Sequence, residues 1–311
     1  MDYRLALSAP VVSLRISIEA VDDVSPPAYL GSALRGLFGH GLRKLACVNP
    51  KVDCKDCPLL ATCVYSRVFL SEGGPLAGDA APTRYVVAPP PRSPASLRKG
   101  EGLDFEMILI RLRAEDMPFI IQAWCCAAER GLGPNNCRFQ IRSIHQEHPV
   151  GSDQWRRIYG AMGRPASVAA SPIPLPPPPS EPIVINLVTP ARLKRNGKLV
   201  RPEAFDAPMF LSALHYRAIE LCGGPRTQPR YETSVHMDQE QLRWSDWTRY
   251  SSRQKTRMQL GGVTGRFVLS GEGLAEHWPV LWRGQWWHIG KTTSMGLGRY
   301  RIEAASLPAA G

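Results

Sequence analysis

A proline-rich stretch at residues 165–182 constrains the fold of this 311-residue chain more than any other feature. It contains eight prolines, including the run from Pro176 to Pro179. Because proline fixes φ and has no backbone N–H, such a run joins neither a helix interior nor a central strand, and it forms a stiff, extended spacer. The sequence therefore predicts two domains, residues 1–164 and 183–311, separated by this linker.

The first domain shows an ordered succession of hydrophobic patterns. Val12, Leu14, Ile16 and Ile18 alternate with polar residues, which is typical of a strand with one buried face. The predicted elements are a strand at 11–19, a helix at 28–46, strands at 84–88 and 102–113, a helix at 116–130 and a strand at 137–148. Strand, helix, strand, strand, helix, strand is the ferredoxin-like order.

The second domain shows a similar but less regular order. Its predicted elements are a strand at 183–188, an Asn196-Gly197 hairpin, helices at 206–222 and 238–260, a strand at 263–270, a short helix at 274–281, and two strands flanking a glycine-rich loop. The predicted fold class is α+β, with two ferredoxin-like (RRM-like) domains in tandem and an arginine-rich helical insertion at 238–260 in the second.

The chain carries an excess of positive charge, and two groups of cations stand out in its second domain. Lys plus Arg exceeds Asp plus Glu by 38 − 27 = 11, which favours a polyanionic partner, although a soluble basic protein would have the same balance. The hairpin carries Arg192, Lys194, Arg195 and Lys198. In the predicted helix at 238–260, Arg249, Arg253 and Arg257 would share one face, with Arg243 nearby, and such a stripe is typical of contact with phosphates.

A glycine-rich loop follows the aromatic residues Trp286 and Trp287, which we assign to a strand. Gly290-Lys291-Thr292 resembles part of a nucleotide-binding loop, but the nearest upstream glycine is misplaced and two more glycines follow where a helix should begin. Together with the basic hairpin, the loop is better assigned to an RNA backbone. Lys291 and Arg299 are then the predicted phosphate contacts, and Gly296 and Gly298 would allow close approach of the RNA.

Four cysteines lie close together in the first domain, in the pattern Cys47-x6-Cys54-x2-Cys57-x5-Cys63. Four thiolates could hold zinc or an iron–sulfur cluster tetrahedrally, and they would leave no position open for catalysis. The alternative is a set of thiols that bind no metal. We therefore predict at most a structural metal, with zinc as the candidate.

The N-terminus carries no secretory signal pattern, and nowhere do about 18 apolar residues run together, as a membrane span would require. We expect a cytoplasmic protein without a membrane partner.

Several short motifs follow one another along nearly the whole chain. They are Gly31-x3-Arg35-Gly36-x2-Gly39-His40-x-Leu42-Arg43, Cys63-x-Tyr65, Thr189-Pro190-x-Arg192-x-Lys194-Arg195-x-Gly197, Trp244-x4-Arg249-x3-Arg253 with Gly261-Gly262, and His288-x-Gly290-Lys291-x4-Gly296-Leu297-Gly298-x-Tyr300. Taken in this order, they resemble the motifs of the CRISPR-associated RAMP endoribonucleases, which cut precursor CRISPR RNA within its repeats. The basic, arginine-rich segment suits the type IV variant.

This resemblance implies binding of a repeat stem-loop and cleavage without a metal or other cofactor. The ribose 2′-OH would attack the adjacent phosphorus, leaving a 2′,3′-cyclic phosphate. The enzyme would keep the mature crRNA and join other subunits of a CRISPR effector complex. The alternative is a non-catalytic RAMP subunit that binds guide RNA as a scaffold.

The resemblance also indicates candidate residues. His40, on the polar side of the first helix, is the candidate catalytic acid or base, with His288 in reserve. Lys44, one turn further, would stabilise the charged phosphorane. The predicted RNA-binding residues are Arg35, Arg43, Arg192, Lys194, Arg195, Lys198, Arg243, Arg249, Arg253, Arg257, Lys291, Gly296, Gly298 and Arg299.

Overall fold

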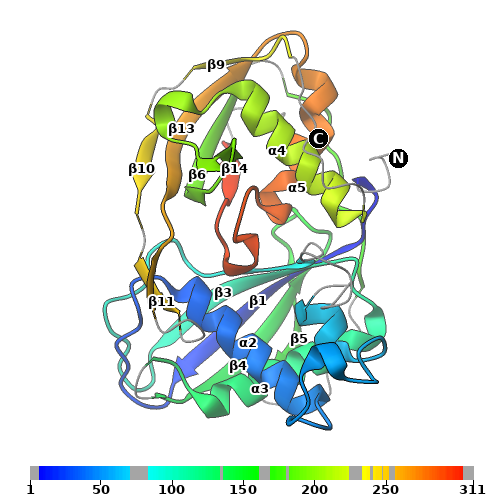
Figure 1. Cartoon of the computed structure of the whole chain (residues 1–311), viewed down its shortest axis with the longest axis vertical. Coiled ribbons are helices and arrows are strands. Elements are labelled where there is room, and N and C mark those ends of the chain that lie inside the picture. The colour runs from blue at the N-terminus through cyan, green and yellow to red at the C-terminus, as the bar shows by residue number, and fades with distance from the viewer. Residues whose placement is uncertain are drawn as a thin grey trace. The chain divides into compact units, whose positions relative to one another are not determined.

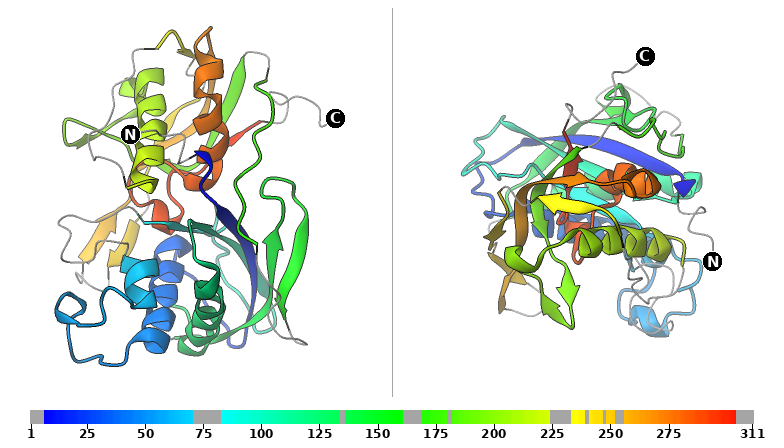
Figure 2. Two further views of the ribbon diagram at one scale, coloured as in Figure 1. Left: turned by 90° about the vertical axis from the view of Figure 1, so that its right-hand side faces the viewer. Right: turned by 90° about the horizontal axis from the view of Figure 1, so that it is seen from above.

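A computed structural model describes residues 7–70, 83–133, 136–160, 169–179, 182–223, 233–238, 241–246, 248–251 and 256–303. The chain divides into two compact units, Ala9–Pro172 and the part that begins at Ile173. The division falls inside the proline-rich stretch. Each unit is an antiparallel sheet with two helices (Figures 1 and 2).

The first unit has the ferredoxin-like arrangement. Its sheet has the order β2-β3-β1-β4-β5, and the helices α2 and α3 lie side by side on one face (Figure 1). On β1, Leu14, Ile16 and Ile18 are buried in the core, as their alternation predicts. The elements are β1 (Val11–Ala20), α2 (Leu30–Ala46), β2 (Tyr85–Ala88), β3 (Gly102–Ile110), α3 (Met117–Arg130), β4 (Phe139–Glu147) and β5 (Trp155–Gly160).

A close contact between α2 and α3 explains why α2 contains Gly41, although glycine inside a helix costs about 1 kcal/mol relative to alanine. A Cβ atom added to Gly41 would lie 2.1 Å from the carbonyl oxygen of Ala123, so any larger residue would push the helices apart. Next to it, Phe38 stacks on Trp124 with ring centroids 5.4 Å apart. Glycine therefore brings the polar side of α2 within reach of the side chains at the end of α3.

The second unit repeats the arrangement. Its sheet has the order β10-β13-β6-β14, with β9 also paired to β13, so β9 and β10 share the place of the second strand. Phe205, Phe210, Phe267 and Tyr300 are fully buried. The elements are β6 (Ile183–Ala191), β7 (Lys194–Arg195), β8 (Lys198–Leu199), α4 (Ala207–Leu221), β9 (His236–Asp238), β10 (Arg243–Ser245), β11 (Thr248–Ser251), β12 (Thr256–Gln259), β13 (Gly262–Ser270), α5 (Leu274–Trp287) and β14 (Tyr300–Ile302).

Part of the proline-rich stretch is bound to the second unit. Trp278 and Trp282 of α5 donate their indole N–H groups to the carbonyl oxygens of Pro176 and Pro174, at 2.8 and 2.7 Å. Ile173 is buried. An extended proline segment exposes its carbonyl groups, and tryptophans spaced one helical turn apart can reach them in succession. The segment that we predicted to be a spacer is therefore partly an element of this unit.

The predicted helix at 238–260 is wrong. Where the structure describes this range it contains strands: β10 extends the main sheet, with Arg243 opposite Thr264, and β11 pairs with β12 as a separate hairpin. Thr248, Tyr250 and Thr256 favour strands, and their β-propensity outweighs the helical spacing of the arginines. Arg249 and Arg257 lie on different strands, so the predicted arginine face does not form, and Arg253 lies outside the described residues.

Two further elements differ from the sequence analysis. The predicted helix at 274–281 continues to Trp287, so Trp286 and Trp287 end α5 and form no strand. Both are buried, which shows that packing against the sheet outweighs the strand preference of aromatic residues. The edge strand β5 was not predicted. Among the described residues, no helix is both long enough and apolar enough to span a membrane.

Candidate active site

His40 lies on the exposed side of α2 and faces the end of α3. The Nη1 atom of Arg130, the last residue of α3, lies 2.9 Å from Nε2 and 3.3 Å from Nδ1 of its ring. Because a guanidinium has only N–H donors, the nearer ring nitrogen must accept and therefore carries no proton. This contact favours a neutral imidazole with a basic lone pair.

Lys44 lies one turn further along α2. Its Nζ is 2.9 Å from Oε2 of Glu129, the neighbour of Arg130 on α3. This hydrogen bond, together with the charge of Glu129, raises the pKa of Lys44, so the ammonium group stays charged at neutral pH. Four side chains, His40, Lys44, Glu129 and Arg130, thus form one polar group across the two helices, which we call the α2–α3 cluster.

The surroundings of His40 favour its neutral form. Partial burial, followed by the positive charges of Arg130, Lys44 and Arg43, lowers the pKa of His40 below its usual range. A neutral histidine with an accessible ring nitrogen can accept a proton, and the adjacent cations can stabilise negative charge formed nearby. The cluster therefore has the parts needed for proton transfer next to an anion.

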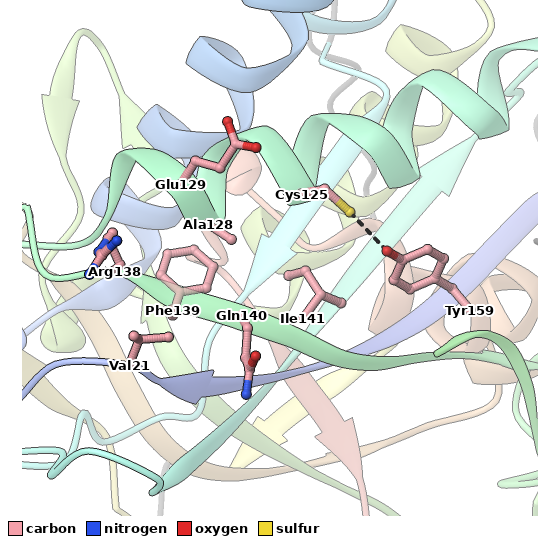
Figure 3. Close-up of a pocket in the computed structure, with 9 residues that line it drawn as sticks. All are labelled: Val21, Cys125, Ala128, Glu129, Arg138, Phe139, Gln140, Ile141 and Tyr159. Carbon is pink, nitrogen blue, oxygen red and sulfur yellow. Dashed lines mark hydrogen bonds between the residues drawn. The ribbon is translucent and has the colours of Figure 1, made fainter. Parts of the chain in front are cut away.

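The cluster borders a shallow hollow between α3 and β4. Figure 3 shows Glu129 on its rim, with Phe139 and Ile141 rising from the strand beneath it. At the far side Cys125 donates a hydrogen bond to Tyr159, with the sulfur 3.3 Å from the phenolic oxygen. The hollow measures about 370 Å³. It offers an apolar floor next to the charged rim.

The other two predicted residues of α2 have protein partners. The guanidinium of Arg35 lies 4.6 Å from the centre of the Phe69 ring, a cation–π contact. The side chain of Arg43 hydrogen-bonds with Cys47, which raises the pKa of Arg43. Both arginines are half-buried. Their roles as RNA contacts remain predictions, and the structure gives each a structural partner.

The predicted basic hairpin is confirmed as β7 and β8. Asn196 and Gly197 have φ of 51° and 80°, the left-handed conformations that a two-residue turn of this kind requires. Lys194 and Lys198 are exposed, and Arg195 forms an ion pair with Asp206 at 2.6 Å. Arg192 donates to the carbonyl of Gly261 at 2.7 Å, and Arg243 is exposed on β10.

The glycine loop makes its hydrogen bonds within its own unit. The Gly296 N–H donates to Thr293 and the Gly298 N–H to Pro190. The hydroxyl of Thr189 accepts from the Arg299 N–H and donates to the carbonyl of Gly296, both at 2.8 Å. These two amides are therefore not free to form a phosphate cradle, and both glycines are buried. Lys291 is exposed at the start of the loop, so it remains available to a phosphate.

Two further observations bear on the reserve histidine, His288, and on the predicted metal site. His288 is only 1% exposed, its Nδ1 lies 3.1 Å from the carbonyl of Leu297, and burial lowers its pKa well below the usual range. This enclosure leaves the ring no open face for a substrate and counts against the reserve assignment, which stays a prediction. Cys47, Cys54, Cys57 and Cys63 line one cavity, but the described residues contain no ready-made metal-binding group of three or more His, Cys, Asp or Glu side chains.

Arg130 and Glu129 were missed by sequence reasoning. Arg130 lies 90 positions from His40 in the chain, and only the packing of α2 on α3 brings the two together. A charged pair at the end of a helix is common, so the sequence contains no signal that separates this pair from an ordinary solvated helix end.

Two protein-family models match the chain, one over each of its two units. The family model AF_1859_N, an N-terminal domain, matches residues 7–171, and the model described as CRISPR-associated endoribonuclease Cas6 matches residues 185–300. No curated protein sequence matches the chain. Two ferredoxin-like units with these matches make the chain similar to CRISPR-associated RAMP proteins. The chain belongs to the AF_1859_N family over residues 7–171, and its residues 185–300 match the Cas6 family model.

Solved structures share the fold. They include a chain of a partial Cas6-RT-Cas1–Cas2 complex (TM-score 0.56, 13% identity, 95% of this chain and 46% of that one). A Cas6 product complex has a TM-score of 0.54 and 14% identity, over 94% of this chain and 99% of that one. Thermus thermophilus Cas6 has a TM-score of 0.50 and 12% identity, over 95% and 99%. The chain thus spans less than half of the first of these, and at such identities the likeness is one of fold alone.

Proposed function

We propose that this protein is an endoribonuclease that binds the stem-loop of CRISPR repeat RNA and cleaves it to mature crRNA. The observation that carries the proposal is the α2–α3 cluster, an accessible histidine held neutral beside two cations in a chain whose residues 185–300 match the Cas6 family model. This reaction is one that such a cluster can perform with protein side chains alone.

In the proposed reaction, His40 removes the proton from the ribose 2′-OH. The 2′-oxygen forms a bond to the adjacent phosphorus, and the bond from phosphorus to the 5′-oxygen breaks. The products are a 2′,3′-cyclic phosphate and a 5′-OH, whose proton comes from water or the imidazolium. Because neutral imidazole is the active base, the lowered pKa of His40 keeps the protein active at neutral pH.

Arg130 has two roles in this mechanism. Without RNA it donates to the imidazole of His40 and occupies the lone pair that catalysis needs. A bound phosphate would attract the guanidinium, because charge-assisted hydrogen bonds to an anion are stronger than one to a neutral ring. Binding would then free the lone pair and place a cation on the phosphoryl oxygens. Lys44, held by Glu129, would add a second positive charge.

RNA binding would also use the second unit. Lys194 and Lys198 project from a hairpin tip with no side-chain acceptor close by among the described contacts, and Lys291 is exposed on the glycine loop. Exposed lysines that neutralise phosphates release counterions, so affinity should fall steeply with salt. Retention of the product, assembly with other subunits, a cytoplasmic location and membership of the type IV variant all belong to the same proposal.

The experiment is a single-turnover assay with repeat RNA in EDTA. A second substrate carries one 2′-deoxy sugar at the cut site, and far-UV circular dichroism of the same sample reports whether the fold survives EDTA. We expect cleavage of the first RNA and binding without cleavage of the second. Cleavage of the 2′-deoxy RNA, or binding of both RNAs without cleavage by folded protein, would reject the proposal. The latter result would identify a scaffold subunit.

A further inference from the structure

The segment between α2 and the π-helix at Ser66–Leu70 folds without a core of its own. None of the residues from Cys47 to Tyr65 is buried, and the only helical element between Cys47 and Cys63 is the three-residue turn Cys54–Asp56. Two of its aliphatic side chains face solvent, with Val48 78% and Leu59 48% exposed. A segment of this kind cannot offset its loss of chain entropy by apolar burial, so a cross-link has to hold it.

Four thiols of this segment turn towards the same cavity. Cys47, Cys54, Cys57 and Cys63 line a single cavity of about 300 Å³, and all four are unpaired thiols that are partly exposed. Cys54 lies within electrostatic range of the other three. Backbone hydrogen bonds from Cys57 N–H to Cys54 and from Cys63 N–H to Leu59 turn the chain so that the four side chains share one side.

A cation accompanies the thiols. Arg43, on the last turn of α2, hydrogen-bonds with Cys47 through its side chain. Arginine beside neutral thiols has little reason to stay there, whereas four thiolates around a divalent ion leave two negative charges that a guanidinium compensates through N–H···S contacts. The position of Arg43 therefore favours a site in which the four sulfurs are thiolates.

We propose that Cys47, Cys54, Cys57 and Cys63 bind one structural zinc ion. Binding would release one proton from each thiol and leave a tetrahedral tetrathiolate, with no open position for a substrate. Since the described residues hold no ready-made metal group, the thiols would converge on the ion as it binds, and the loose turns between them permit that movement.

The site has a mechanical consequence for the first unit. Cys47 directly follows α2, and Cys63 comes just before the π-helix, whose Arg67 forms a bidentate ion pair with the buried Asp116 at the start of α3. Zinc would thus complete a brace from the end of α2 to the start of α3. This inference concerns folding, and it stands or falls separately from the proposed nuclease.

The test begins with metal analysis of the full-length protein, purified without chelator. We expect about one zinc per chain, and a loss of at least about tenfold in Cys54→Ser and Cys57→Ser. Cys137→Ser is the matched control, because Cys137 is also partly exposed but lies outside the cavity, and it should keep the zinc.

A second measurement covers variants that fail to fold. Chelator-treated wild-type protein is titrated with Co²⁺, and we expect the intense visible and thiolate charge-transfer absorption of tetrahedral cobalt, bleached by one equivalent of Zn²⁺. Wild-type protein that contains no zinc and gives no such spectrum would overturn the proposal. So would an intact mass four hydrogens short in freshly purified protein, since it would show two disulfides in place of a metal.

Discussion

The α2–α3 cluster and the glycine loop contain similar residue types but differ in what their polar groups contact. In the loop, the amides of Gly296 and Gly298 and the hydroxyl of Thr189 are satisfied within the second unit. In the cluster, His40, Lys44, Glu129 and Arg130 are exposed side chains that hydrogen-bond across the two helices. A polar group can act on a ligand only if the fold leaves it accessible, so the less conspicuous motif is the better candidate site.

The histidines show the same contrast. Burial and nearby cations lower the pKa of both His40 and His288, so both rings are neutral at pH 7. His288 is enclosed by its own unit, while His40 is exposed to solvent. A lowered pKa alone therefore does not identify a catalytic base, and accessibility has to accompany it.

The largest expected effect comes from His40→Ala. Removing a general base typically costs about 10²–10⁴-fold in rate. We expect single-turnover cleavage of repeat RNA to fall by that amount, with RNA affinity changed less than about threefold in a filter-binding assay. The matched control is His236→Ala, which removes another exposed histidine, in the second unit. Wild-type cleavage by His40→Ala would remove this residue from the mechanism.

A substitution in the glycine loop should lower the stability of the protein. A Cβ on Gly298 would lie 1.9 Å from the carbonyl oxygen of Ile289, and its φ is +72°. We expect Gly298→Ala to lower the free energy of unfolding by about 3 kcal/mol, measured by urea denaturation. Gly197→Ala is the control, because its φ is +80° but nothing lies within 4 Å, and it should cost only about 1 kcal/mol. Equal losses would show that crowding at Gly298 has no role.

Sequence reasoning found the parts that depend on local pattern. The alternation in β1, the apolar stripe of α2 and the Asn196-Gly197 turn each arise from neighbouring residues, and the ferredoxin-like order of the first unit follows from such elements. Sequence reasoning failed where contacts between residues far apart in the chain determine the secondary structure. The arginines of β11 and β12 have helical spacing but pair as strands, and α5 continues through Trp286 because its aromatic side chains are buried on the sheet.

The candidate site shows the same division. His40 and Lys44 could be proposed from one helix, because residues four apart share a face. Arg130 could not, since its place beside His40 depends on the close approach of the two helices at Gly41. The satisfied amide of Gly298 was equally hidden, because its acceptor, Pro190, lies about a hundred residues away in the chain.

A buried histidine pair in the second unit should make its stability depend on pH. His215 Nε2 lies 2.9 Å from His277 Nδ1, and burial, then the charge of His277, lowers the pKa of His215 to about 4. The unfolded chain binds this proton more readily, so stability is full above about pH 6.5 and falls towards pH 4, by up to about 3 kcal/mol. Burial of polar groups in the second unit, already seen in the glycine loop, should therefore be measurable here as a pH-dependent stability.

The measurement is thermal or urea unfolding at pH 7 and pH 4.5 for the wild type and His215→Gln. Glutamine stays neutral, so the variant should lose less stability between the two pH values, although it starts slightly lower at pH 7. His236→Gln, an exposed histidine of the same unit, should behave as the wild type does. If the stability difference between the wild type and His215→Gln is the same at both pH values, His215 does not take up a proton on unfolding.

The smallest effect, and the most specific, is expected for Arg130→Ala. Losing one cation near the phosphorane should slow cleavage by about tenfold. Because the positive charge of Arg130 lowers the pKa of His40, its removal should raise that pKa, and the rate, which requires neutral imidazole, should begin to fall at a higher pH. Arg113→Ala, which removes an exposed arginine just before α3, is the control and should leave the pH–rate profile unchanged. A slower Arg130→Ala enzyme with an unshifted acid limb would mean that Arg130 contacts the RNA without tuning His40, and the cluster would then be a binding surface whose base lies elsewhere.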